Sequence, residues 1–189
     1  MDTIDLLLTR RSVKAAMLTE PGPTPEHLET ILRAGMRVPD HGKLAPWRFV
    51  VIEGKAREAF GDLLADIYLR NNPDARVAQL QFNRDLALRA PVIVAVISKR
   101  LMGQKIPVWE QELSSAAACQ NMLIAATALG YGCQWLTEWP AYDAEVQEAL
   151  GGGEDDRIAG FLYFGTASEK PDERPRPEYN DIVSRWSGA

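Results

Sequence analysis

The sequence is poor in the residues from which metal and thiol sites are built. Its 189 residues include two histidines and two cysteines. Two histidines are too few for a multi-histidine metal site, and no cluster of Asp, Glu and Cys takes its place. Cys119 and Cys133 do not have the spacing of a redox or zinc motif. With no secretory context, we expect two reduced thiols in a cytoplasmic protein.

Long apolar runs are also missing, and we expect no secretory leader. No segment reaches about 18 uninterrupted apolar residues, so we expect no transmembrane helix. The N-terminus lacks the apolar core and small-residue cleavage site of a secretory signal. The formal net charge of −5 gives no basic field, so we expect no nucleic-acid partner. The length and an ordinary hydrophobic content of 46% predict a single domain over residues 1–189.

Several well-known catalytic motifs are absent as well. No G-x-G-x-x-G opens a helix after a strand, which argues against a Rossmann dinucleotide site. No G-x-S-x-G elbow is present, and Ser114 and Ser115 lie within an expected helix without a nearby base. The triple glycine 151–153 follows a helix, and no Lys or Ser completes a phosphate loop, so we interpret it as a helix terminator.

The periodicity of apolar residues predicts helices that alternate with strands. We expect helices over residues 3–9, 25–36, 55–70, 75–88, 109–129 and 144–150, and strands over residues 48–53, 91–98, 133–137 and 158–165. This order indicates an α/β or α+β sheet layered with helices. Residues 116–129 are apolar on nearly all faces, which is typical of a helix buried in a core or against a partner subunit. A proline-rich, charged arm follows over residues 167–189.

Two polar clusters near the N-terminus are the candidates for chemistry. Arg10, Arg11 and Ser12 follow the first helix, and arginine beside serine is suited to binding a phosphate. The alternative is a solvated basic helix end, which the helix dipole favours. Arg37 and His41 form the second cluster, and they could equally be a surface cation and a loop histidine. Together the clusters suggest a phosphorylated cofactor.

Two further groups of residues leave their role open on local chemistry. Trp135 and Thr137 end a predicted strand, where sites of open sheets tend to lie, but Trp135 could also fill the core. Arg174 and Arg176 lie in the arm. Such a segment is usually a solvated linker, although it could fold back and add cations to an anion site.

The ordered set of motifs resembles the FMN-dependent nitroreductase family, and most closely its small subgroup of NAD(P)H nitroreductases. The resemblance covers nearly the whole chain, and the blocks are specific as a set. They are Arg10-Arg11-Ser12, residues 34–41 followed by 46–49, the alanine-rich helix into Gly130-Tyr131-Gly132, and residues 160–166.

The resemblance implies an α+β fold with a central, mostly antiparallel sheet flanked by helices. It also implies a homodimer with the long apolar helix at the interface and the C-terminal arm exchanged between subunits. Two FMN molecules would lie at that interface, each touched by both chains. This arrangement would explain why the helix is apolar on both sides.

The resemblance also assigns candidate cofactor contacts. Arg10, Arg11 and Ser12 match the block that holds the FMN phosphate and ribityl chain, and Arg37 and His41 match contacts from the opposite subunit. Members of the subgroup can carry Arg and Ser where this chain has Leu136 and Thr137, so Leu136 can offer only its backbone. The complete set of expected contacts adds a segment after the long helix, Trp135, Leu136 and Thr137, and an arm pair, Arg174 and Arg176.

The function implied is hydride transfer from NADH or NADPH to FMN and then to a nitroaromatic, quinone-like or unknown small-molecule acceptor, in a ping-pong cycle. The flavin carries this chemistry, so no catalytic side chain is expected. The alternative is a flavin-binding or flavin-fragmenting protein of the same fold without NAD(P)H oxidase activity.

Overall fold

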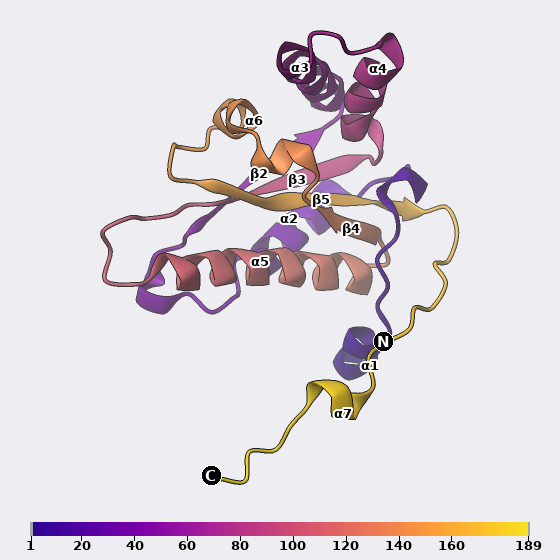
Figure 1. The fold of residues 1–189 in the computed structure, drawn as a ribbon. Coiled ribbons are helices and arrows are strands. Elements are labelled where there is room, and N and C mark those ends of the chain that lie inside the picture. The colour runs from indigo at the N-terminus through magenta and orange to yellow at the C-terminus, as the bar shows by residue number, and fades with distance from the viewer. Residues whose placement is uncertain (1, 189) are drawn as a thin grey trace.

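A computed structural model describes residues 2–188 as an antiparallel sheet between two layers of helices (Figure 1). The strands follow the order β1-β5-β3-β2, and β4 also pairs with β5. All of these pairings are antiparallel. The strands are β1 (Leu18–Thr19), β2 (Trp47–Glu53), β3 (Val92–Ser98), β4 (Gly132–Leu136) and β5 (Arg157–Ala167).

The helices divide between the two faces of the sheet. Helices α2 and α5 cover one face, and α3, α4 and α6 cover the other, while α1 and α7 lie beyond α5 on the side away from the sheet (Figure 1). The α-helices are α1 (Thr3–Thr9), α2 (Pro25–Gly35), α3 (Lys55–Asn71), α4 (Val77–Asp85), α5 (Val108–Ala128), α6 (Ala144–Ala149) and α7 (Tyr179–Ile182).

Strand β3 is buried on both faces, which explains its continuous apolar run. Ile93, Ala95 and Ile97 point into the core beneath α3 and α6. The alternate residues, Val92, Val94 and Val96, point into the core beneath α2 and α5. Burial of each Val or Ile side chain contributes about 1.5–3 kcal/mol. The sheet therefore needs a helical layer on each side.

Helix α5 has an inner face and an outer face that differ in exposure. Ala118, Met122 and Ala126 are fully buried against the sheet. On the outer side Trp109 and Leu113 are 66% and 49% exposed. Within residues 116–129, which were expected to be apolar on nearly all faces, Ile124 and Ala125 are half-buried and Ala128 is exposed. Only the inner half of this segment is therefore fully buried in one chain.

The expected elements are present, with small differences. The helix expected over residues 75–88 is α4 followed by a separate 3₁₀ turn, Leu86–Leu88. Strand β1 was missed because its two residues are too few to show a periodicity, although they pair with Thr166 and Ala167. Helix α7 was missed because it lies in the charged arm. Within residues 2–188, no helix is both long and apolar enough to cross a membrane.

Gly160 in β5 lies against the indole of Trp135. A Cβ atom at position 160 would lie 2.0 Å from Trp135 Nε1 and 2.4 Å from its Cδ1. The same indole nitrogen donates a hydrogen bond to the carbonyl of Ala159 (3.0 Å). A side chain at position 160 would therefore displace the indole and break this bond.

Gly160→Ala should lower the free energy of unfolding by about 1–3 kcal/mol, because the added methyl group forces Trp135 out of its packed position. Urea or thermal unfolding measures this loss. Gly153→Ala is a matched control, because its Cβ would meet nothing closer than 3.7 Å. We expect the control to change stability by less than about 0.5 kcal/mol. Equal stability of the two variants would contradict the close contact.

Candidate functional site

The first expected group, Arg10 to Ser12, is held at the end of α1. The backbone N–H of Val13 donates to the carbonyl of Cys133 (2.9 Å), which fastens this segment to the start of β4. Arg10 Nη2 donates to Ser12 Oγ (3.2 Å). Arg10 Nε is buried, and among residues 2–188 it has no hydrogen-bond partner. The Nε atoms of Arg57 and Arg100 are in the same state, so this feature does not by itself identify a site.

The C-terminal arm folds back onto Arg11. Arg11 Nε donates to the carbonyl of Asp172 (2.8 Å) and lies 3.8 Å from Glu173 Oε1. Arg176 Nη2 lies 3.4 Å from the same carboxylate oxygen. Glu173 is therefore an anion between two guanidinium groups, Arg11 and Arg176. The backbone N–H of Arg174, and then these two cations, lower the pKa of Glu173.

A cleft of about 390 Å³ lies between the segment that follows α1 and the C-terminal arm. Arg11, Ser12 and Lys14 line one side, and residues 169–173 of the arm line the other. Sequence reasoning missed Lys14, although a third cation so close to Ser12 was a usable signal. Arg174 is placed differently from Arg176, because only its backbone N–H contacts Glu173 (2.8 Å). The cleft is thus lined by cations (Arg11, Lys14 and Lys170) and by acidic residues of the arm, and Glu173 pairs with Arg11 and with Arg176.

The second expected group, Arg37 and His41, is spread along α5, with His41 at its first turn and Arg37 beside its second half. His41 Nδ1 is 2.7 Å from Glu110 Oε2 in the first turn of that helix. The carbonyl of Arg37 accepts a hydrogen bond from Asn121 (3.0 Å). The side chain of His41 is 64% exposed. Both expected contacts therefore sit on the surface of this chain.

The length of α5 separates His41 from the segment that carries Arg10. The 17 residue steps from Glu110 to Thr127 span about 25 Å at about 1.5 Å per residue. His41 contacts Glu110 in the first turn, whereas the segment after Arg10 is bonded through Val13 to Cys133, whose thiol is 3.6 Å from Thr127 Oγ1 in the last turn. No hydrogen bond or ion pair within residues 2–188 links the groups. One chain does not bring them together.

The third expected group is the end of β4. The indole of Trp135 lies on the α5 side of the sheet, beside an apolar hollow of about 300 Å³ that Trp109 and Leu113 also line. Leu136 packs against the opposite core. Thr137 is half-buried and follows the strand. Trp135 is thus both a core residue and part of a surface hollow.

The two thiols and the possible metal ligands do not add a second reactive site within residues 2–188. Burial raises the pKa of Cys119 to about 12 and also raises that of Cys133, so both thiols stay protonated near neutral pH. Within the described part of the chain, no group of three or more His, Cys, Asp or Glu side chains could hold a metal ion.

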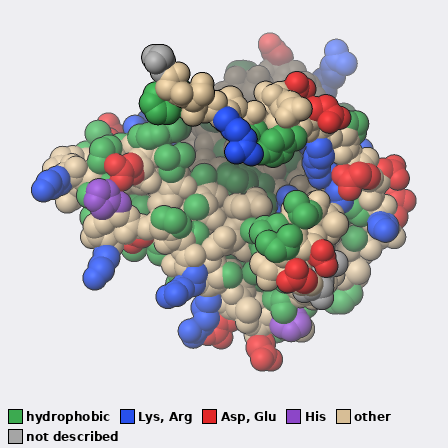
Figure 2. All heavy atoms as spheres, turned by 90° about the horizontal axis from the view of Figure 1, so that it is seen from below, with side chains coloured by type: hydrophobic (Ala, Val, Ile, Leu, Met, Phe, Trp, Pro, Cys, Tyr) green, Lys and Arg blue, Asp and Glu red, His purple; other side chains and the backbone are tan. Residues whose placement is uncertain are grey.

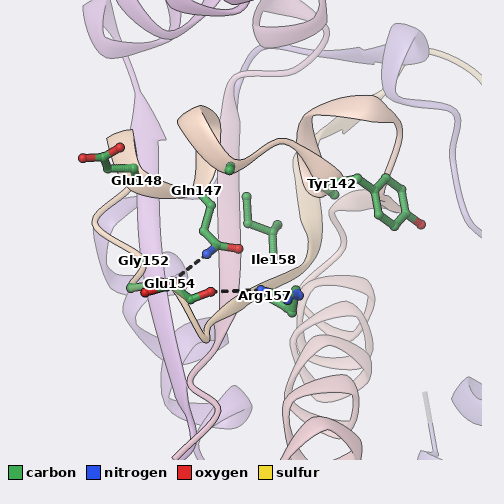
Figure 3. Close-up of a pocket in the computed structure, with 10 residues that line it drawn as sticks. Tyr142, Gln147, Glu148, Gly152, Glu154, Arg157 and Ile158 are labelled. Carbon is green, nitrogen blue, oxygen red and sulfur yellow. Dashed lines mark hydrogen bonds between the residues drawn. The ribbon is translucent and has the colours of Figure 1, made fainter.

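A wider cleft, about 870 Å³, lies between α6 and the start of β5. Figure 3 shows Gln147 and Glu154 turned toward neighbouring backbone and side-chain groups, while Tyr142 points away. Gln147 Nε2 donates to the carbonyl of Gly153 (2.6 Å). None of the expected site residues lines this cleft, so we do not assign it to the candidate site.

The sequence was compared with protein families and with curated proteins. A sequence model described as the nitroreductase family matches residues 7–166. The chain is 44% identical over 174 residues to the Escherichia coli (strain K12) protein "Putative NAD(P)H nitroreductase YdjA", and the match covers 90% of this chain and 91% of that protein.

Solved structures share the fold. A nitroreductase-like family protein from Bacillus cereus superposes with a TM-score of 0.86 at 21% identity, covering 100% of this chain and 97% of that chain. A nitroreductase with bound FMN from Bacteroides fragilis NCTC 9343 superposes with a TM-score of 0.72 at 20% identity, covering 99% and 100%. At these identities, the likeness establishes the α+β fold.

Proposed function

Because the chain belongs to the nitroreductase family, we propose that it is an oxidoreductase that binds FMN. We further propose that it transfers electrons from NADH or NADPH to a nitroaromatic, quinone-like or other small-molecule acceptor. The observation that carries this proposal is the anion position made by Arg11 and Arg176, which already hold the Glu173 carboxylate at the cleft that Ser12 also lines. The names of the relatives, NAD(P)H nitroreductase and nitroreductase with bound FMN, support it.

The donor set around Arg10 fits a phosphate group. Two guanidinium groups and a hydroxyl supply charged and neutral donors, and arginine binds phosphate oxygens through paired N–H groups. The Glu173 carboxylate already lies beside Arg11 and Arg176, so this position accepts an anion. We propose that Arg10, Arg11 and Ser12 hold the FMN phosphate, with Arg176 and Arg174 closing over it from the arm.

The remaining candidates would orient the flavin ring. FMN, when bound, supplies the hydride acceptor and donor on which the reaction depends. We propose that Trp135, Thr137 and the backbone of Leu136 line the ring. Arg37 and His41 would contact it from a second subunit. No side chain of this chain is assigned a catalytic step, since binding and orientation are what the protein provides.

A homodimer would complete the site. In a twofold dimer with α5 packed antiparallel against its copy, the last turn of one helix lies beside the first turn of the other. Arg10 of one chain would then approach His41 of its partner. The exposed apolar side chains on this side of the molecule support such an interface (Figure 2). They come from α1, α5 and the arm and include Ile4, Leu7, Leu8, Trp109, Leu113, Tyr179, Ile182 and Trp186.

The purified protein should carry FMN, and its visible flavin absorption should bleach when NADH or NADPH is added without oxygen. Hydride transfer from the nucleotide causes this loss, and adding a nitroaromatic or quinone should restore the colour. Anaerobic absorption spectroscopy with each nucleotide measures both steps. A yellow protein that neither nucleotide bleaches would favour a flavin-binding or flavin-fragmenting protein. A colourless protein that takes up no FMN would contradict every flavin function.

Arg10→Ala should weaken FMN binding by about 1.5–3 kcal/mol, because it removes a charge-assisted contact to the phosphate. This loss corresponds to a Kd at least about tenfold higher in a fluorescence titration. Arg33→Ala is the control, because Arg33 pairs with Glu29 on the surface of α2, 2.6 Å away. An unchanged Kd in Arg10→Ala would exclude the phosphate role.

Mixed dimers of Arg10→Ala and His41→Ala chains should bind one FMN, whereas each homodimeric variant should bind FMN poorly at both sites. If each site uses Arg10 of one chain and His41 of the other, one site of the mixed dimer carries both substitutions. The other site then carries neither of them. Two affinity tags allow the mixed dimer to be purified, and its absorption spectrum gives the flavin content. Poor binding at both sites of the mixed dimer would place Arg10 and His41 in the same site of one chain.

A further inference from the structure

The backbone immediately after β4 adopts a conformation that is costly for a residue with a side chain. Glu138 has φ 43° and ψ −176°. A positive φ combined with an extended ψ is almost restricted to glycine. Residues persist in such conformations only when their surroundings hold them there. Glu138 directly follows Trp135 to Thr137, the segment proposed to line the flavin.

An ion pair holds the side chain of Glu138. Arg89 Nη1 donates to Glu138 Oε2 at 2.7 Å. The side chain of Arg89 is 19% exposed and that of Glu138 is 36% exposed, so this pair is more buried than most surface ion pairs. Arg89 also lies over the ring of Phe82, with its Cζ 5.7 Å from the ring centre. The Arg89 guanidinium therefore contacts both Phe82 of α4 and the carboxylate of Glu138.

A second contact holds the next residue. Trp139 Nε1 donates to Asn83 Oδ1 (2.7 Å). Asn83 is 3% exposed, and its amide group donates to the carbonyl of Gln79 (2.8 Å). The ring of Trp139 also packs against Tyr68 in α3. Helices α3 and α4, together with the turn that follows them, thus hold both residues that come after Thr137.

We propose that Arg89 is a positioning residue, which holds Glu138 in its strained conformation so that the backbone of Leu136 and Thr137 faces the cofactor. This inference rests on the proposed FMN function. Leu136 has no polar side chain, so its contribution to binding depends on the direction of its backbone. Asn83 assists by holding Trp139. Neither Arg89 nor Asn83 is required to touch the flavin.

The test compares FMN affinity and the position of the flavin absorption bands in a set of variants. Arg89→Ala should raise the Kd for FMN about tenfold, as expected for loss of a half-buried charged contact, and should shift the visible bands. Arg89→Lys should recover part of both, because it keeps the charge. Arg84→Ala is a matched control, because it breaks an ion pair between α4 and Asp62 (2.5 Å), five residues before Arg89, but leaves Glu138 untouched.

Two substitutions of Glu138 separate a backbone role from direct contact by the carboxylate. Glycine adopts a positive φ at little cost, whereas alanine does not. If Arg89 acts by holding the backbone, Glu138→Gly should bind FMN more tightly than Glu138→Ala. Replacing Arg89 by Ala in the Glu138→Gly protein should then have little further effect. Equally weak binding by the Gly and Ala variants would overturn the positioning role.

Different experimental results would overturn the FMN function and the positioning role of Arg89. A wild-type protein that takes up no FMN overturns both. Wild-type binding combined with a wild-type Kd and spectrum in Arg89→Ala overturns the positioning role alone, even if this variant unfolds at a lower temperature. Lower stability with unchanged binding would mean that the ion pair only stabilises the fold. If Arg89→Ala does not fold, the comparison of Arg89→Lys and Glu138→Gly with the wild type decides the same question.

Discussion

Burial of α5 against the sheet determines where each candidate site residue lies. Ala118, Met122 and Ala126 have no exposed surface, so the helix cannot slide or rotate without opening a close-packed core. Its first turn stays beside His41, and its last turn stays beside Cys133 and the segment that carries Arg10. His41 and the segment that carries Arg10 therefore lie about 25 Å apart along the helix in one chain. A single site that used both His41 and Arg10 would need residues of two chains.

The C-terminal arm contacts the N-terminal segment that carries Arg10 and Arg11. Glu173 sits where an anion would be held, between Arg11 and Arg176. A phosphate at this position would compete with that carboxylate for the same guanidinium groups. The dianion offers more acceptor oxygens than the carboxylate does. The exposed Glu173 side chain can leave for solvent at little cost. The arm is thus suited to exchange one anion for another while Arg11 remains paired.

Much of the fold could be predicted from the sequence, because its signals are long and local. Strand β3 is a seven-residue apolar run, and α2 begins with Thr24, whose side chain accepts from the N–H of His27 as an N-cap does. The family could be recognised from the order of its motifs, and the comparisons confirm it. The expected cofactor contacts stay predictions. Glu173 and the strained Glu138 were missed because their roles depend on tertiary contacts with residues far away in the sequence, whereas Lys14 was missed despite its closeness to Ser12.

The net charge of the chain limits how the arginine cluster, Arg10 and Arg11, can attract a phosphate. A net charge of −5 repels an approaching phosphate at long range. Affinity must then come from short contacts that solvent does not screen, and these require donors that are already desolvated. A solvated helix end would leave Arg10 in water, where its guanidinium would have no reason to prefer one anion. Arg10 is instead half-buried, with its Nε shielded from solvent and its Nη2 bonded to Ser12 Oγ. The guanidinium is therefore held in place, so a phosphate that contacts its accessible N–H groups loses less conformational entropy than with a mobile arginine. Such preorganised short contacts can bind a phosphate against the field of an acidic protein.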